Sequence, residues 1–148
     1  MSTFDYTQEE RARDVTSEHY MKFYIETPIE DLTVTVGDED SETVTVTGQI
    51  TDPAGDAINE SLVVRVVMFT DANFDTPDAA IANIDVTATT GVILKENFAD
   101  IDLEVLTDDT GLFVLVWTDT DTQTESTFPL FILPNGKVIE GAEIAFAA

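Results

Sequence analysis

The stretch that decides the fold is LTDDTGLFVLVWTD, residues 106–119. Its first half, TDDTG, combines aspartates with a glycine and is typical of a tight turn. Its second half, LFVLVW, is apolar at every position, with Phe113, Leu115 and Trp117 alternating with Leu112, Val114 and Val116. A short apolar run bounded by a turn predicts a β-strand with two apolar faces.

Runs with a period of two continue on both sides of this stretch. Thr90-Gly91 is expected to close a hairpin between two of these runs, and Asn135-Gly136 predicts a second tight turn. Short strands with turn signals about every ten residues predict an all-β chain folded as an antiparallel β-sandwich. The predicted strands are 32–36, 43–50, 61–69, 84–89, 92–96, 101–106, 126–133 and 137–146.

The first 27 residues differ from the rest and are expected to form an N-terminal arm, with the sandwich domain over 28–148. Thr7 and Glu10 fit a capping box, which predicts at most one short helix over about 8–14. The segment HYMKFYIE, residues 19–26, alternates and places Met21, Phe23 and Ile25 on one face.

Three segments resemble prokaryotic and viral immunoglobulin-like domains. They are VTVTGQITDPAGDAI (44–58), LTDDTGLFVLVWTD, and ILPNGKVIEGAEIAF (132–146), within a resemblance that covers about 32–148. The resemblance implies an immunoglobulin-like sandwich. Such modules occur in surface adhesins, beside carbohydrate-processing enzymes, and on virions as decoration or tail-associated domains.

The charge is strongly negative, with 30 Asp and Glu against 6 Lys and Arg, a formal net charge of −24. A field of that sign repels phosphate backbones, so we expect no nucleic-acid partner. Many acids, few lysines, no cysteine and 22 threonines resemble the composition of proteins from salt-accumulating halophiles. We expect no signal peptide and no membrane insertion, because the N-terminus lacks an apolar core and LFVLVW is too short to span a bilayer.

Residues that could carry chemistry are few. The single histidine, His19, lies in the arm, and the sequence has no nucleotide-binding or hydrolase motif. We therefore expect no enzymatic activity and no cofactor. Two acidic stretches could bind a cation, although same-face carboxylates on a strand are too far apart for one ion, so a solvated face is the favoured interpretation. The candidates are Asp38, Asp40 and Glu42 in the first stretch, and Asp119 and Asp121, followed by Glu125, in the second.

The predicted strands 61–69 and 112–117 are apolar on both faces, although a sandwich strand needs only one. An outer apolar face in so acidic a protein marks an interface, unless the arm covers it with Met21, Phe23 and Ile25. Both alternatives remain open from the sequence. The candidate interface residues are Phe4, Tyr6, Met21 and Phe23 in the arm, and Val63, Val67, Phe69, Phe113, Leu115 and Trp117 in the strands.

These expectations favour a structural protein that assembles with copies of itself and with a larger particle. A virion component exposed to a salty exterior, either a capsid decoration or a tail-associated subunit, is the expected setting, and the arm is the expected assembly latch. The alternative is a carbohydrate-binding or cell-surface-binding module, for which Trp117, Phe74, Tyr20 and Tyr24 are the aromatic candidates.

Overall fold

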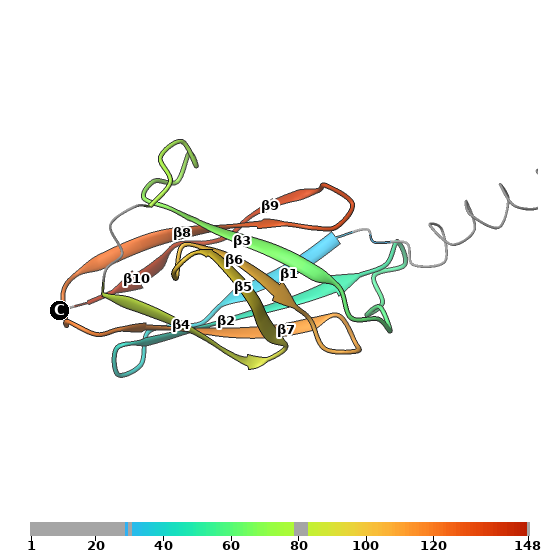
Figure 1. The fold of residues 1–148 in the computed structure, drawn as a ribbon, viewed down its shortest axis with the longest axis horizontal. Coiled ribbons are helices and arrows are strands. Elements are labelled where there is room, and N and C mark those ends of the chain that lie inside the picture. The colour runs from blue at the N-terminus through green and yellow to red at the C-terminus, as the bar shows by residue number, and fades with distance from the viewer. Residues whose placement is uncertain (1–28, 30, 79–82, 148) are drawn as a thin grey trace, which may run out of the picture.

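The computed structural model describes residues 29, 31–78 and 83–147, and these residues form ten β-strands and no helix (Figure 1). Accordingly, the described part of the chain contains no helix that could cross a membrane. The strands are β1 Asp31–Val36, β2 Thr43–Thr51, β3 Val63–Phe69, β4 Ile84–Thr90, β5 Val92–Phe98, β6 Asp102–Leu106, β7 Leu112–Asp119, β8 Glu125–Ile132, β9 Val138–Glu140 and β10 Ile144–Phe146.

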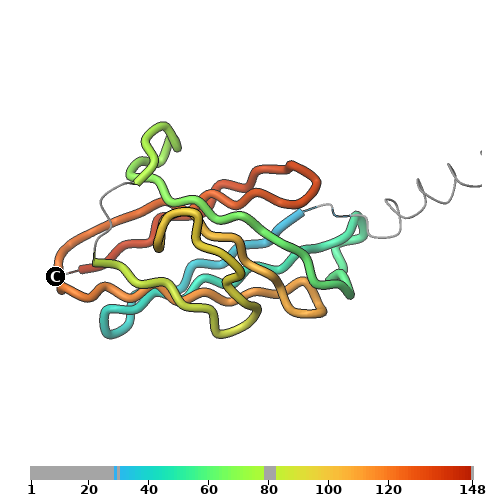
Figure 2. Tube along the Cα trace, viewed as in Figure 1, coloured from blue at the N-terminus to red at the C-terminus, as the bar shows by residue number. Residues whose placement is uncertain are grey.

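The strands form two antiparallel sheets packed face to face, as the layers in Figures 1 and 2 show. One sheet has four strands in the order β1-β2-β7-β4. The other has six, in the order β10-β8-β3-β6-β5, with β9 also paired to β8. The predicted all-β antiparallel sandwich is therefore confirmed.

The core lies between the sheets and follows the period of two in each strand. On β3 the buried side chains are Val64, Val66 and Met68, and on β7 they are Phe113, Leu115 and Trp117. The rings of Phe113 and Phe131 face each other from opposite sheets, with centroids 5.8 Å apart. Large apolar side chains from both sheets thus fill one continuous core.

The predicted hairpin across Thr90-Gly91 is wrong, because β4 and β5 belong to different sheets. β4 pairs with β7, whereas β5 pairs with β6. Gly91 has a φ of 79°, and a Cβ there would lie 2.4 Å from the carbonyl oxygen of Leu106. Glycine is needed at this corner, where the chain passes from one sheet to the other.

The C-terminal run predicted as one strand is split into β9 and β10. Both pair with β8, β10 with residues 125–127 and β9 with 130–132. Pro129 lies between these two pairings, and Gly141 packs so closely on it that a Cβ would be 2.7 Å from its ring. The Asn135-Gly136 turn is confirmed, because Gly136 donates to the Leu133 carbonyl at 2.9 Å and has a φ of 87°.

The described chain begins beside this turn. The Ile29 carbonyl oxygen accepts a hydrogen bond from Asn135 Nδ2 at 3.1 Å, and the Ile29 side chain packs against the core. Lys137 and Asp31 form an ion pair at 3.3 Å. The arm predicted over 1–27, with its short helix and with Phe4, Tyr6, Met21 and Phe23, lies outside the described residues.

Candidate interaction surface

Three of the predicted interface residues are core residues. Phe113, Leu115 and Trp117 are 0% exposed, so they present no surface to a partner and the prediction for them is wrong. β7 has two apolar faces, and the bulkier face points inward because it fills the space between the sheets. For the same reason Trp117 cannot provide a stacking platform for a sugar.

The three interface residues predicted on β3 point away from the core. Val63 is exposed and Val67 and Phe69 are half-buried, on the outer side of the six-stranded sheet. Cross-strand register extends this row, because Val63 pairs with Leu106 and Leu106 with Val92, and Val67 pairs with Leu130. We call this surface the outer apolar face; it consists of Val63, Val67, Phe69, Val92, Phe98, Leu106, Phe128, Leu130, Ile132 and Val138.

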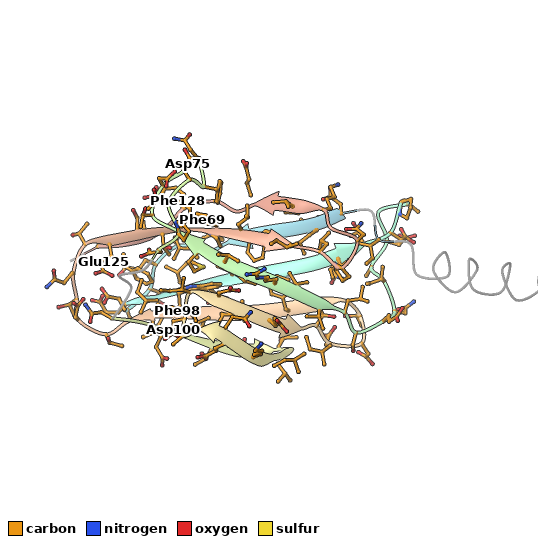
Figure 3. All side chains as sticks on the ribbon, turned by 45° about the horizontal axis from the view of Figure 1, so that its top comes forward. Phe69, Asp75, Phe98, Asp100, Glu125 and Phe128 are labelled. Carbon is orange, nitrogen blue, oxygen red and sulfur yellow. The ribbon has the colours of Figure 1, made fainter. Side chains whose placement is uncertain are left out.

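The exposed apolar side chains are concentrated on this sheet. Within the residues that the structure describes, five large apolar side chains are exposed to solvent: Val63, Val92, Leu94, Phe98 and Val138. All five lie on β3, β5 or β9, and none lies on the four-stranded sheet. Phe98 is the most open at 59% exposed, and Figure 3 shows it on the same side of the molecule as Phe69 and Phe128.

The outer side of the four-stranded sheet is chemically different. It presents threonines from β1, β2, β4 and β7, with Val114 and Val116 half-buried among them. A threonine hydroxyl can be hydrated while its methyl group covers the sheet. This side therefore needs no partner; its threonines include Thr33, Thr35, Thr43, Thr45, Thr47, Thr87 and Thr118.

A compact polar cluster interrupts the outer apolar face. Arg65 donates from Nε and Nη2 to the two carboxylate oxygens of Asp102, at 2.9 and 2.7 Å. Asn97 Nδ2 donates to Asp102 at 3.4 Å and to Glu104 at 3.3 Å. The hydrogen bonds that Arg65 donates lower the pKa of Asp102, so the Asp102 carboxylate stays ionised. The guanidinium of Arg65 balances this negative charge locally.

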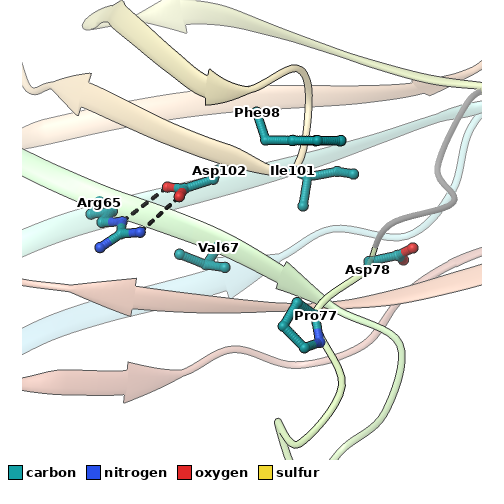
Figure 4. Close-up of a pocket in the computed structure, with 7 residues that line it drawn as sticks. All are labelled: Arg65, Val67, Pro77, Asp78, Phe98, Ile101 and Asp102. Atoms are coloured by element: carbon teal, nitrogen blue, oxygen red, sulfur yellow. Dashed lines mark hydrogen bonds and ion pairs between the residues drawn. The ribbon is translucent and has the colours of Figure 1, made fainter.

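A pocket of about 320 Å³ lies beside this cluster at one end of the outer apolar face (Figure 4). Val67 on β3 and Phe98 on β5 line it on either side of Asp102, and Pro77 and Ile101 close it from two loops. Its walls are mainly apolar, with Arg65 and Asp102 at one side. A pocket of this size and character accommodates an apolar group that carries a hydrogen-bonding end.

The two acidic stretches meet at one end of the sandwich, because β2 begins where β7 ends. Asp119 donates its backbone N–H to the Glu42 carbonyl at 2.8 Å. Asp119 is itself buried and its carboxylate accepts from the Asp121 and Gln123 amides, so the expectation that it lies on a solvated face is wrong. The inward alternation of β7 continues through Asp119, and the buried carboxylate closes the turn that follows.

The remaining acids of the two stretches differ in their surroundings. Asp38 and Asp40 are exposed in the β1–β2 connection, where Asp40 accepts from Ser41 Oγ. Burial and the neighbouring carboxylate of Asp119 raise the pKa of Asp121. Within the described residues no three acidic or histidine side chains are arranged to hold a metal ion. The cation-site hypothesis for either stretch therefore has no geometric support.

Sequence reasoning missed the contribution of the edge strands and the loops. Val92 and Phe98 lie on β5, where register shifts interrupt the pairing with β6, and Val138 lies on β9, a strand of three residues. The pocket walls at Pro77 and Ile101 come from loops that only the tertiary fold brings together. The only available signal was the apolar content of VILKENF (92–98), which is high for an edge strand.

The chain aligns with solved structures only at low sequence identity. No protein-family model and no curated protein matches the chain. Among solved structures, a lipoprotein from Bacteroides thetaiotaomicron aligns with a TM-score of 0.49 at 18% identity, over 80% of this chain and 81% of that one. A conjugate transposon protein from Bacteroides vulgatus aligns with a TM-score of 0.45 at 17% identity, over 82% and 86% of the two chains.

Proposed function

We propose that this protein is a non-enzymatic assembly protein that associates with other protein subunits through the outer apolar face. The observation that carries the proposal is the placement of every exposed large apolar side chain of the described residues on one sheet of a chain with net charge −24. Monomeric proteins rarely leave a contiguous apolar surface open, and a patch bounded by polar residues marks an interaction site.

The charge distribution supports association at the same surface. The described residues contain three basic side chains, and all lie on the six-stranded sheet or its β8–β9 turn: Arg65, Lys95 and Lys137. Two copies of so acidic a protein repel each other least where basic side chains pair locally with the acids, as Arg65 does with Asp102. Salt then screens the remaining repulsion, since the Debye length falls from about 10 Å at 0.1 M to about 3 Å at 1 M.

For the biological setting, we propose a virion component, either a capsid decoration or a tail-associated subunit, with the threonine-rich and acidic surfaces facing a salty exterior. The support is the resemblance to immunoglobulin-like modules together with the composition, so this part of the proposal is an argument by analogy. Mass spectrometry of purified particles from the source of the sequence tests it, because the chain should be present at a fixed ratio to the major capsid protein. Its absence from such particles would exclude this setting while leaving the association surface untouched.

The association itself is tested by light scattering of the full chain from about 0.1 to 3 M salt. We expect a mass above that of one chain, increasing with salt. The double substitution Val67→Lys/Phe98→Lys should return the mass to one chain, because it places two charges on the outer apolar face on either side of Asp102.

A matched control is available on the opposite sheet. Thr45 and Thr87 flank Val116 as Val67 and Phe98 flank Asp102, and both threonines are exposed. Thr45→Lys/Thr87→Lys adds the same charge at the same spacing and should leave the mass unchanged. A wild-type chain that stays monomeric at all salt concentrations, or two double variants with equal effects, would overturn the proposal.

A carbohydrate-binding or cell-surface-binding module is the second candidate, and one observation favours it. Phe98 offers an open aromatic ring beside the paired polar groups of Arg65, Asp102 and Asn97. Sugars bind in this manner, with a ring stacked on an aromatic side chain and hydroxyls on charged or amide groups. A glycan array would favour this function if binding occurs to the monomer and is lost in Phe98→Ala.

A further inference from the structure

We infer that the occupant of the outer apolar face is the N-terminal segment HYMKFYIE, residues 19–26, of a second copy of this chain. This inference rests on the proposed function and names its partner. Four observations lead to it: where the chain joins the sandwich, the length of the segment, its side-chain pattern and its charge.

The chain joins the sandwich at the border of the outer apolar face. Ile29 is hydrogen-bonded to Asn135 in the β8–β9 turn, and Lys137 in the same turn pairs with Asp31. The turn connects Ile132 and Val138, which both belong to the outer apolar face and pair with each other. Residues 1–28 therefore join the sandwich at Ile29, beside the outer apolar face.

The segment is long enough to cross that surface. Eight extended residues span about 26 Å at about 3.3 Å each, whereas the five strands from β9 to β5 span about 19 Å at about 4.8 Å per step. The alternation of side chains along residues 19–26 also fits this placement. In an extended segment, Met21, Phe23 and Ile25 share one side, and Tyr20, Lys22 and Tyr24 share the other. One side can contact the sheet while the other remains in solvent.

The charge of the segment permits this placement. Residues 1–28 contain three of the six basic side chains, Arg11, Arg13 and Lys22, but only six of the 30 acids. Residues 19–26 themselves carry one base, Lys22, and one acid, Glu26, so the segment adds no net repulsion against the acidic sandwich. The pocket beside Phe98 is a suitable receptor for one apolar side chain of the segment, with the Arg65–Asp102 pair at its rim.

A second copy is favoured over the chain's own face because of Pro28. Covering its own outer apolar face would require the segment to fold back onto the sandwich from Ile29, which is held at the β8–β9 turn. Proline fixes its own φ and keeps the preceding residue, Thr27, extended. A turn at Thr27 is therefore disfavoured, and the segment is assigned to the face of a neighbouring copy.

Mixing two variants that are each defective at one side of the contact tests the inference. Phe23→Ser removes the central anchor of the segment, and Val67→Lys/Phe98→Lys blocks the receiving face. Loss of a central aromatic anchor should weaken association roughly 30-fold or more, so each full-length variant alone should be monomeric by light scattering. Their mixture should form dimers, because the intact segment of one binds the intact face of the other.

The control variant is Tyr24→Ser, which alters the opposite side of the segment and should associate like the wild type. Circular dichroism of every variant confirms that the sandwich is folded. A mixture that remains monomeric would overturn the inference, and so would a Phe23→Ser variant that associates normally. The second result would leave the proposed association surface standing, whereas a monomeric wild type would overturn both.

Engineered cysteines provide an independent measurement, since the natural chain has none. Oxidising a mixture of Phe23→Cys and Val67→Cys chains should give a covalent heterodimer, and replacing Phe23→Cys with Tyr24→Cys should reduce its yield. If the double variant Phe23→Cys/Val67→Cys instead forms only an internal disulfide within a monomer, the segment covers its own chain and the second-copy assignment is wrong.

Discussion

At the scale of single residues, Gly48 is the described glycine whose missing side chain leaves the least room, because the ring of Phe113 occupies that space. Gly48 and Phe113 are paired across β2 and β7, and a Cβ on Gly48 would lie 2.1 Å from the ring of Phe113. Gly48→Ala should therefore displace the ring and lower the free energy of unfolding by about 1–3 kcal/mol. Urea unfolding followed by the fluorescence of Trp117, the single buried tryptophan, measures this change.

The neighbouring substitution Thr47→Ala is the control, because Thr47 points outward and its loss should change the stability by no more than about 0.5 kcal/mol. Equal effects at 47 and 48 would contradict the packing described. The sequence could not predict this contact. A glycine within a strand indicates a close approach of some kind, but only the register of β2 and β7 identifies Phe113 as the group that approaches.

At the scale of structural elements, the β7–β8 loop carries an electrostatic cost. Burial, and then the charges of Asp121, Asp119 and Asp78, raise the pKa of Glu125. An acid whose pKa is raised in the folded state destabilises the fold when ionised, and the penalty is relieved as pH falls toward its ordinary value of 4.5. Glu125→Gln should therefore stabilise the protein at neutral pH and lose that advantage in mildly acidic solution.

Urea unfolding at two pH values and constant salt measures this effect. Glu140→Gln on β9 is the control, because it changes the net charge equally at an exposed position away from the loop. The same gain in both variants would show that general charge repulsion and not the loop is responsible, and a pH-independent gain would show that ionisation of Glu125 is not the cause.

The positions of most β-strands were predictable from the sequence, but which strands pair with each other was not. The period of two located β1, β2 and β6, the two-sided apolar runs located β3 and β7, and the predicted turn at Gly136 has a positive φ. Thr90-Gly91, however, suits a tight hairpin and a corner between sheets equally well, since both need a glycine. The choice depends on which strands β4 and β5 meet, β7 and β6, and these contacts are distant in sequence.

At the scale of the whole molecule, the outer faces of the two sheets differ in chemical character. The four-stranded sheet presents threonines to solvent, and the six-stranded sheet presents apolar side chains around one Arg–Asp pair. The sequence predicted that an outer apolar face exists, from the two-sided strands β3 and β7. Of the strand candidates, the three on β3 lie on the outer side of the sheet, whereas the three on β7 point inward. Which face of a two-sided strand turns inward depends on core volume, a property of the assembled sheets.

The central claim is that association buries the outer apolar face, and hydroxyl-radical footprinting of Phe98 in the full chain tests it most directly. Phe98 is 59% exposed in the single chain, whereas Phe113 is fully buried and serves as an internal reference. The reactivity of Phe98 should fall sharply as protein and salt concentration are raised through the association range, with Phe113 unreactive throughout. A Phe98 ring that remains equally reactive in the associated protein would contradict the account.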